Sequence, residues 1–118
     1  MERQNVIKEK SYKFALRIVN LYKYLIDNKN EYILSKQILR SGTSIGANIE
    51  EGLGTRTKRD FINKFSIAHK EAREVHYWIR LLRDSGYLEN KLSESLLFDC
   101  NELLKITGKI ISTSGKTI

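Results

Sequence analysis

The residues of this chain best suited to acid–base chemistry are two histidines, His69 and His76, which lie seven positions apart with Arg73 between them. A helical zinc protease needs histidines four positions apart with a glutamate beside the first, and neither condition is met. Di-iron bundles need a Glu-x-x-His on each of two helices, which is also missing. Helical ribonucleases of the HEPN type place their arginine further ahead of the histidine than Arg73 stands from His76. We therefore predict no catalytic residue, no metal site and no enzymatic activity.

Two segments imitate nucleotide-binding loops. One contains four of the seven glycines, between Gly42 and Gly54, but it lacks the preceding strand and the glycine spacing of a phosphate-binding loop. The other, Ser114-Gly115-Lys116-Thr117, has Ile110 where such a loop has its first glycine. We reject both segments as phosphate sites and predict that no cofactor is bound.

Basic residues outnumber acidic ones by 21 to 14, which gives a net charge of +7 at neutral pH. The whole excess falls in residues 1–30 and 56–83. If these segments are helices packed side by side, they form one positive face, the usual electrostatic mark of a polyanion partner. The other interpretation is a solvated face that only keeps the protein soluble. The residues expected to contact phosphates or stack on a base are Lys13, Arg17, Arg59, Lys70, Arg73, Tyr77 and Arg80.

Four stretches with helical spacing of apolar residues must position these side chains. They cover about 7–28, 32–53, 57–85 and 90–113, and the chain contains no proline to interrupt them. The third has the clearest seam, stepping alternately by four and three positions through Phe61, Phe65, Ala68, Ala72, Val75, Ile79 and Leu82. Thr57 and Asp60 before it are typical of an N-terminal cap. We predict one all-α domain over 1–118, an antiparallel up-down-up-down four-helix bundle.

The third segment has a second flank that is apolar and acidic. It consists of Ile67, Glu71, Glu74, Trp78 and Leu81. A solvated face needs neither the tryptophan nor the leucine, so we predict that this flank is an interface between copies of the chain. The alternative is a slightly rotated bundle that buries Trp78 in its own core.

Small and polar residues gather in the second segment. Gly42 and Gly46 are four positions apart and form a smooth strip that permits close approach of another helix. Ser44, Asn48 and Glu51 form a polar row on the same segment. We expect this row to be structural, to hydrogen-bond to neighbouring helices, and so to fix register or assembly.

Features of cellular location are few. The single cysteine, Cys100, cannot form an intrachain disulfide. The N-terminus has no apolar h-region, and no segment approaches the ~18 consecutive apolar residues of a membrane-spanning helix. These observations favour a cytoplasmic protein with no membrane partner.

The second and third segments resemble a known family of bacterial four-helix bundles. The resemblance is carried by the run Arg40-Ser41-Gly42-Thr43-Ser44-Ile45-Gly46-Ala47-Asn48-Ile49-Glu50-Glu51-Gly52, by Phe61, by the run Ala68 to Leu82, and by Gly86-Tyr87-Leu88. Members include the proteins encoded in 23S ribosomal RNA intervening sequences, and a relative is the accessory variability protein of diversity-generating retroelements. The resemblance covers about Tyr12 to Ile111. The first and fourth segments match mainly in pattern.

The resemblance implies an antiparallel bundle that assembles into a ring-like homopentamer. In the retroelement relatives a basic outer surface binds nucleic acid and a reverse transcriptase. Ser44, Asn48, Glu51 and Gly52 match motif positions of the family that look structural rather than catalytic. The chain departs from the family at Glu50, where alanine is usual, and in lacking a proline near Asn28 to Asn30, and neither departure threatens the fold.

Three functions compete on these observations. The leading hypothesis is a non-enzymatic oligomer that binds RNA or DNA through its basic surface. The second is a protein-interaction scaffold whose charge meets an acidic partner. The third is a helical ribonuclease that uses His69 or His76.

Overall fold

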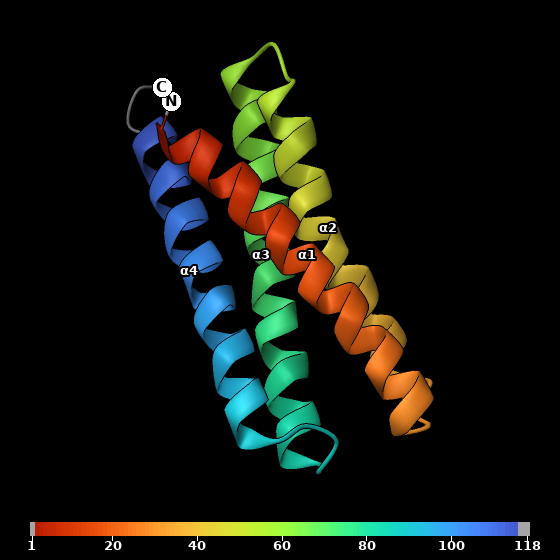
Figure 1. Ribbon diagram of the computed structural model, residues 1–118. Coiled ribbons are helices and arrows are strands. Elements are labelled where there is room, and N and C mark those ends of the chain that lie inside the picture. The colour runs from red at the N-terminus through yellow and green to blue at the C-terminus, as the bar shows by residue number, and fades with distance from the viewer. Residues whose placement is uncertain (1, 116–118) are drawn as a thin grey trace.

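The computed structural model describes residues 2–115 and contains four helices connected by short turns (Figure 1). No strand occurs within this range. Successive helices run in opposite directions, so the predicted all-α up-down bundle is confirmed. The helices are α1 (Glu2–Asn28), α2 (Leu34–Leu53), α3 (Lys58–Asp84) and α4 (Asn90–Gly115). α1 begins five residues before its predicted start, and Ile7, at that start, is fully buried in the core.

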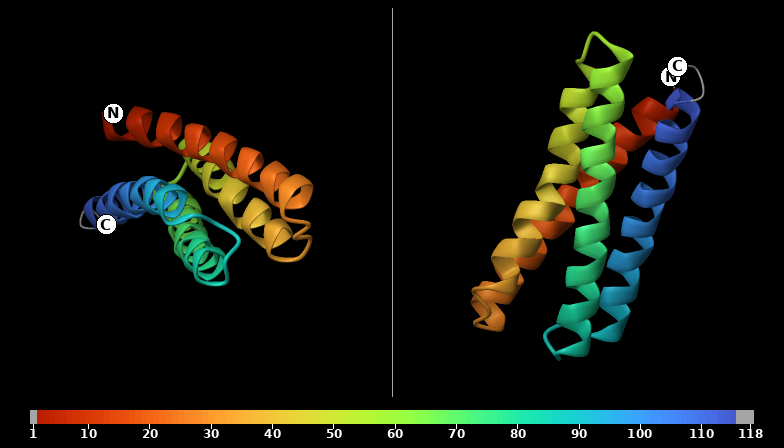
Figure 2. Two further views of the ribbon diagram at one scale, coloured as in Figure 1. Left: turned by 60° about the horizontal axis from the view of Figure 1, so that its bottom comes forward. Right: turned by 180° about the vertical axis from the view of Figure 1, so that it is seen from behind.

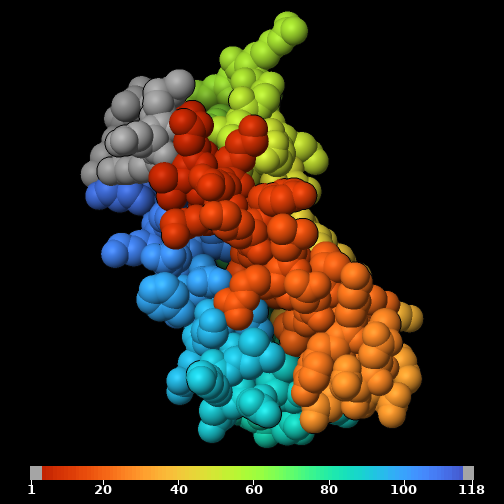
Figure 3. Space-filling view, viewed as in Figure 1, coloured from red at the N-terminus to blue at the C-terminus, as the bar shows by residue number. Residues whose placement is uncertain are grey.

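The order of the helices around the bundle follows the chain. Each helix packs against the next one in sequence, and α4 closes the arrangement by packing against α1. α1 and α3 therefore lie on a diagonal, and no Cα atom of one comes within 8 Å of the other. Figure 2 shows α1 paired with α2 and α3 paired with α4, with the two pairs crossing at an angle. In the space-filling view α1 lies across the face between α4 and α2 (Figure 3).

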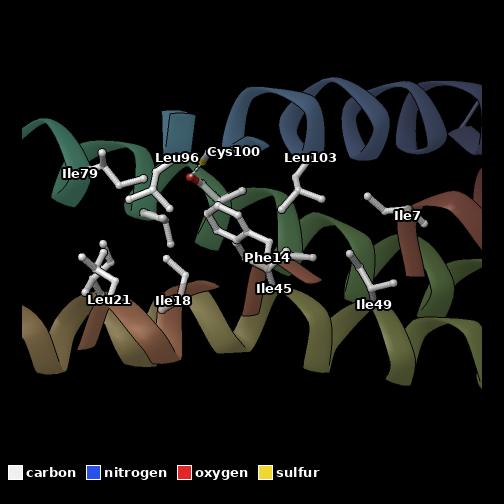
Figure 4. Close-up of a cluster of buried hydrophobic side chains, with 14 of the residues drawn as sticks. Ile7, Phe14, Ile18, Leu21, Ile45, Ile49, Ile79, Leu96, Cys100 and Leu103 are labelled. Atoms are coloured by element: carbon white, nitrogen blue, oxygen red, sulfur yellow. Dashed lines mark hydrogen bonds between the residues drawn. The ribbon is translucent and has the colours of Figure 1, made fainter. Parts of the chain in front are cut away.

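The core is continuous along the bundle. Phe14 of α1 and Phe65 of α3 are its largest fully buried side chains. Ile18, Ile45 and Leu103 lie near Phe14 in the same cluster (Figure 4). The predicted seam of α3 is buried from Phe65 to Leu82, whereas Phe61 at its start is half-buried and stacks on Phe65 with ring centroids 4.4 Å apart. Because the seam of α3 points inward, its opposite side must face solvent. No helix within residues 2–115 is long and apolar enough to cross a membrane.

Cys100 is part of this core. Its thiol donates a hydrogen bond to the carbonyl oxygen of Ala72, with Sγ 3.2 Å from the oxygen. Burial raises the pKa of the thiol to about 12. The thiol therefore stays protonated near neutral pH, and Cys100 acts as a packing residue.

The helix ends are fixed by side chains and by one glycine. Thr57 caps α3 by accepting a hydrogen bond from the backbone N–H of Asp60 (3.1 Å), as predicted. α3 ends at Asp84, and the chain turns away from it at Gly86, which has a φ of +89° that glycine adopts without strain. The start of α2 is capped by Glu31, a residue that sequence reasoning missed. Its buried carboxylate accepts hydrogen bonds from the N–H groups of Ile33, Leu34 and Ser35 at 2.7–3.3 Å.

The glycine strip of α2 faces α1, which explains its residue types. A Cβ atom on Gly42 would lie 2.7 Å from Cγ1 and Cγ2 of Ile18, and one on Gly46 would lie 3.4 Å from the backbone oxygen of Ser11. The prediction of a close helix approach is therefore confirmed. Glycine is required at position 42 because a methyl group there would overlap a fully buried isoleucine.

The polar row of α2 behaves differently from its prediction. Ser44 donates to the carbonyl of Ser41 (3.0 Å) and Asn48 to the carbonyl of Ser44 (2.8 Å), both within α2. Only Glu51 reaches another helix, through an ion pair with Lys64 of α3 (2.7 Å). The expected network between helices is thus wrong for Ser44 and Asn48, because short polar side chains on a helix reach their own preceding carbonyls first.

Candidate nucleic-acid interface

A row of exposed side chains follows the outer side of α3, and we call it the α3 basic strip. It is opposite the buried seam and consists of Arg59, Lys70, Arg73, Tyr77 and Arg80. Among the side chains that the structure describes, no carboxylate lies within 4.0 Å of the four cationic groups. Asp84, one turn beyond Arg80, pairs with Arg83 instead (2.7 Å). The strip therefore keeps uncompensated positive charge on the surface.

The cations of α1 have a different environment. Arg17 pairs with Asp99 of α4 (2.7 Å) and donates to the carbonyl of Ser95 (3.4 Å). Lys13 pairs with Glu9 on its own helix (3.4 Å). Both residues lie on α1, which is diagonal to α3. The two basic segments are therefore not packed side by side, and the predicted joint positive face does not form. Lys13 and Arg17 are therefore separate from the α3 basic strip, and Arg17 ties α1 to α4.

The fourth helix adds two cations that sequence reasoning missed. Lys105 and Lys109 are exposed and form no ion pair with any described side chain, and they line one surface hollow together with Gly108. Gly108 faces α3, since a Cβ atom there would lie 3.4 Å from Cε1 of His69. Asp99 and Glu102 of this helix pair with cations of α1, so the low net charge of the segment conceals the two exposed lysines.

His69 lies half-buried between α3 and α4. Its Nδ1 is 2.8 Å from Oγ1 of Thr107, whose hydroxyl donates to the carbonyl of Leu103 (2.7 Å). The hydroxyl has one hydrogen, so Nδ1–H of His69 is the donor to Thr107. Burial, and secondly the charge of Arg73, lower the pKa of His69 below its ordinary value. The imidazole is therefore neutral near pH 7.

His76 lies two turns further along the same side of α3. Its Nδ1 accepts a hydrogen bond from Nε of Arg80 (3.1 Å). Burial is the largest cause that lowers the pKa of His76, followed by the charges of Arg80 and Arg83, while a hydrogen bond with Asn101 opposes the shift. Each histidine is thus held by a structural partner. Within the described residues no group of three or more His, Cys, Asp or Glu side chains is placed to hold a metal ion.

The acidic and apolar flank of α3 faces α2. Arg40 of α2 pairs with Glu71 (3.2 Å) and with Glu74, and Nε1 of Trp78 donates to Glu74 (3.2 Å). Trp78 packs against the core and stays partly exposed. Its position is therefore intermediate between the two alternatives, a surface interface residue and a buried core residue. Ile67 and Leu81 are half-buried in the same way. The flank therefore keeps apolar surface that the monomer covers incompletely.

The sequence and fold of the chain are similar to those of known proteins. The family model described as "23S rRNA-intervening sequence protein" matches residues 3–109. The chain belongs to this family. A solved structure, described as a protein with unknown function from the S23 ribosomal protein family of Bacteroides thetaiotaomicron VPI-5482, is 50% identical and superposes with a TM-score of 0.92. The match covers 93% of this chain and 98% of that chain. No curated protein matches the chain significantly.

Membership of the 23S rRNA-intervening sequence protein family confirms the resemblance seen in the sequence. The solved relative shares the bundle over nearly its whole length, and it is described as a protein with unknown function. The family therefore accounts for the fold, and the function has to be argued from the surface of this member. Its most distinctive surface is the α3 basic strip.

Proposed function

We propose that this member of the 23S rRNA-intervening sequence protein family is a non-enzymatic, oligomeric nucleic-acid-binding protein. The observation that carries the proposal is the α3 basic strip, whose four cations have no carboxylate within 4.0 Å among the described side chains. Unpaired cations in a row attract a polyanion, because each phosphate they neutralise releases condensed counterions. Lys105 and Lys109 of α4 increase this attraction.

Weak sequence preference follows from the same contacts. Lysine and arginine bind phosphates without reading base edges, so they supply affinity and orientation rather than sequence recognition. The exposed side of a helix also offers no enclosed pocket for a base pair. We therefore propose a binder of nucleic-acid backbone, with Tyr77 as the side chain able to contact a base.

The non-enzymatic part of the proposal rests on the two histidines. A pair of acid–base catalysts needs groups whose pKa values are pushed apart, one toward the acid form and one toward the base form. The pKa values of both histidines are instead lowered, and each imidazole forms a structural hydrogen bond. Incubation with labelled RNA, with and without divalent metal, should leave the RNA intact. Cleavage that His69→Ala or His76→Ala abolishes would support the ribonuclease instead.

The oligomeric part rests on the flank of Ile67, Glu71, Glu74, Trp78 and Leu81. All five side chains are half-buried, so a second copy of the chain would remove further apolar area from water. This flank and the α3 basic strip are on different sides of α3. Assembly through the flank would therefore leave the strip free, and a ring would repeat it once in each subunit.

The binding proposal is tested with a charge-reversed strip and a matched control. Lys70→Glu/Arg73→Glu reverses two strip cations, and Lys23→Glu/Lys36→Glu reverses two exposed cations of α1 and α2 that form no ion pair with described side chains. Both variants change the net charge equally. We expect the strip variant to lose about tenfold or more in affinity for a fluorescein-labelled RNA hairpin, and the control to lose much less. Equal losses would mean that total charge, and not the strip, governs binding.

A further inference from the structure

We propose that Tyr77 and Arg80 form a stacking platform for an unpaired nucleobase, so that the α3 basic strip takes single-stranded segments in preference to duplex. This inference rests on the proposed function and names the class of nucleic acid that the same surface binds. The observations that support it are the contacts of the Tyr77 ring with Arg80 and Trp78.

The ring of Tyr77 is exposed and flanked by two planar groups. Tyr77 is 49% exposed, and it lies on the outer side of α3. The guanidinium of Arg80 lies over the ring, 5.8 Å from its centroid. The ring of Trp78 meets it edge to face, with centroids 5.1 Å apart and an interplanar angle of 69°. Stacking on an aromatic ring beside an arginine is the usual way in which proteins hold single strands.

The platform is held in place from both sides. On one side Trp78 donates to Glu74, and Glu74 pairs with Arg40 of α2. On the other side Nε of Arg80 donates to Nδ1 (3.1 Å) and to the backbone oxygen (3.3 Å) of His76. These contacts reduce the side-chain freedom that binding would otherwise have to remove, so the platform is pre-organised for a ligand.

The geometry favours an unpaired base over a paired one. In a duplex both faces of an internal base are covered by its neighbours, so a ring on the convex outside of a helix cannot reach them. A single strand exposes its base faces. Arg73 stands one turn before Tyr77 on the same side of α3, where it can hold the phosphate of a stacked nucleotide. Electrostatics alone would favour the duplex, because its charge density is higher.

The test compares Tyr77→Leu and Tyr77→Phe on two fluorescein-labelled RNAs of equal length, an oligouridylate without structure and a hairpin whose paired stem is closed by a non-nucleotide linker. Tyr77→Leu keeps an apolar, helix-favouring side chain but removes the ring. We expect it to weaken binding of the oligouridylate by at least about fivefold, the lower end for base–aromatic stacking, with little effect on the hairpin. Tyr77→Phe keeps the ring and should bind both RNAs like the wild type.

A second signal comes from the only tryptophan of the chain. Because Trp78 contacts Tyr77, its fluorescence should change when the oligouridylate binds and change less with the hairpin. Equal effects of Tyr77→Leu on both RNAs, or no effect on either, would overturn the stacking platform. If Lys70→Glu/Arg73→Glu still weakens binding in that case, the proposed function stands without the platform. If neither RNA binds the wild type, both proposals fail.

Discussion

Glu31 caps the start of α2 with its side chain. It is only 8% exposed, and its carboxylate accepts hydrogen bonds from three N–H groups at the start of α2, which no intrahelical carbonyl can satisfy. Glu31→Ala should therefore lower the free energy of unfolding by about 1–3 kcal/mol, measured by urea denaturation. Glu89→Ala removes an exposed carboxylate without such bonds and should stay within about 0.5 kcal/mol of the wild type. Equal stability of the two variants would contradict the cap.

The two histidines make stability depend on pH in a defined direction. Their pKa values in the folded protein are below the ordinary value of about 6.5 that they regain on unfolding. Between the two values the unfolded chain binds more protons, so acidification favours unfolding. The free energy of unfolding should fall as the pH is lowered from about 7.5 to about 5.5.

This pH dependence is checked with a double variant. His69→Gln/His76→Gln keeps hydrogen-bonding side chains but cannot titrate, so its unfolding free energy should change less over the same range. Urea denaturation at a series of pH values measures both proteins. A wild-type curve that is flat, or that rises toward low pH, would contradict the lowered pKa values.

At the scale of helix pairs, Gly42 sets the distance between α1 and α2. A Cβ atom there would lie 2.7 Å from Cγ1 and Cγ2 of Ile18, a β-branched side chain that is fully buried. Gly42→Ala should cost about 1–3 kcal/mol of unfolding free energy despite the higher helix propensity of alanine. Gly54→Ala is the matched control, since its Cβ would meet nothing nearer than 3.6 Å. The account of the close approach would be wrong if Gly42→Ala stabilised the protein.

Helix pairs also show what could be predicted from the sequence. The seam from Phe65 to Leu82 and the outward position of Lys70, Arg73, Tyr77 and Arg80 both follow from the 3.6-residue period of a single helix. The cap at Thr57 could be predicted as well, because a helix cap depends only on residues a few positions apart in the sequence. The fold and the position of the α3 basic strip could therefore be predicted from the sequence.

Contacts between helices were not accessible in this way. The pairs of Arg17 with Asp99 and of Arg40 with Glu71 depend on helix register, which no single periodic pattern fixes. Glu31 was missed because it lies in the turn before α2 rather than on a periodic face. Lys13 and Arg17 were grouped with the α3 cations although a sequential bundle places alternate helices on the diagonal.

At the scale of the whole molecule, the proposed assembly predicts a mass well above the 13.7 kDa of one chain. Trp78 is the largest side chain of the flank, so Trp78→Ala should shift the mass toward that of the monomer while circular dichroism still reports mostly helix. Sedimentation equilibrium at micromolar concentration measures the shift. A wild-type protein that sediments as a monomer would contradict the interface.

The central claim is that the α3 basic strip contacts the phosphates of a nucleic acid, and the salt dependence of binding tests it most directly. The slope of log affinity against log salt reports the number of phosphates neutralised, at roughly 0.7 to 0.9 for each contact. Lys70→Glu/Arg73→Glu should therefore flatten the wild-type slope by roughly 1.4 to 1.8 for two lost contacts, while Lys23→Glu/Lys36→Glu keeps it. A strip variant with the wild-type slope would show that Lys70 and Arg73 touch no phosphate.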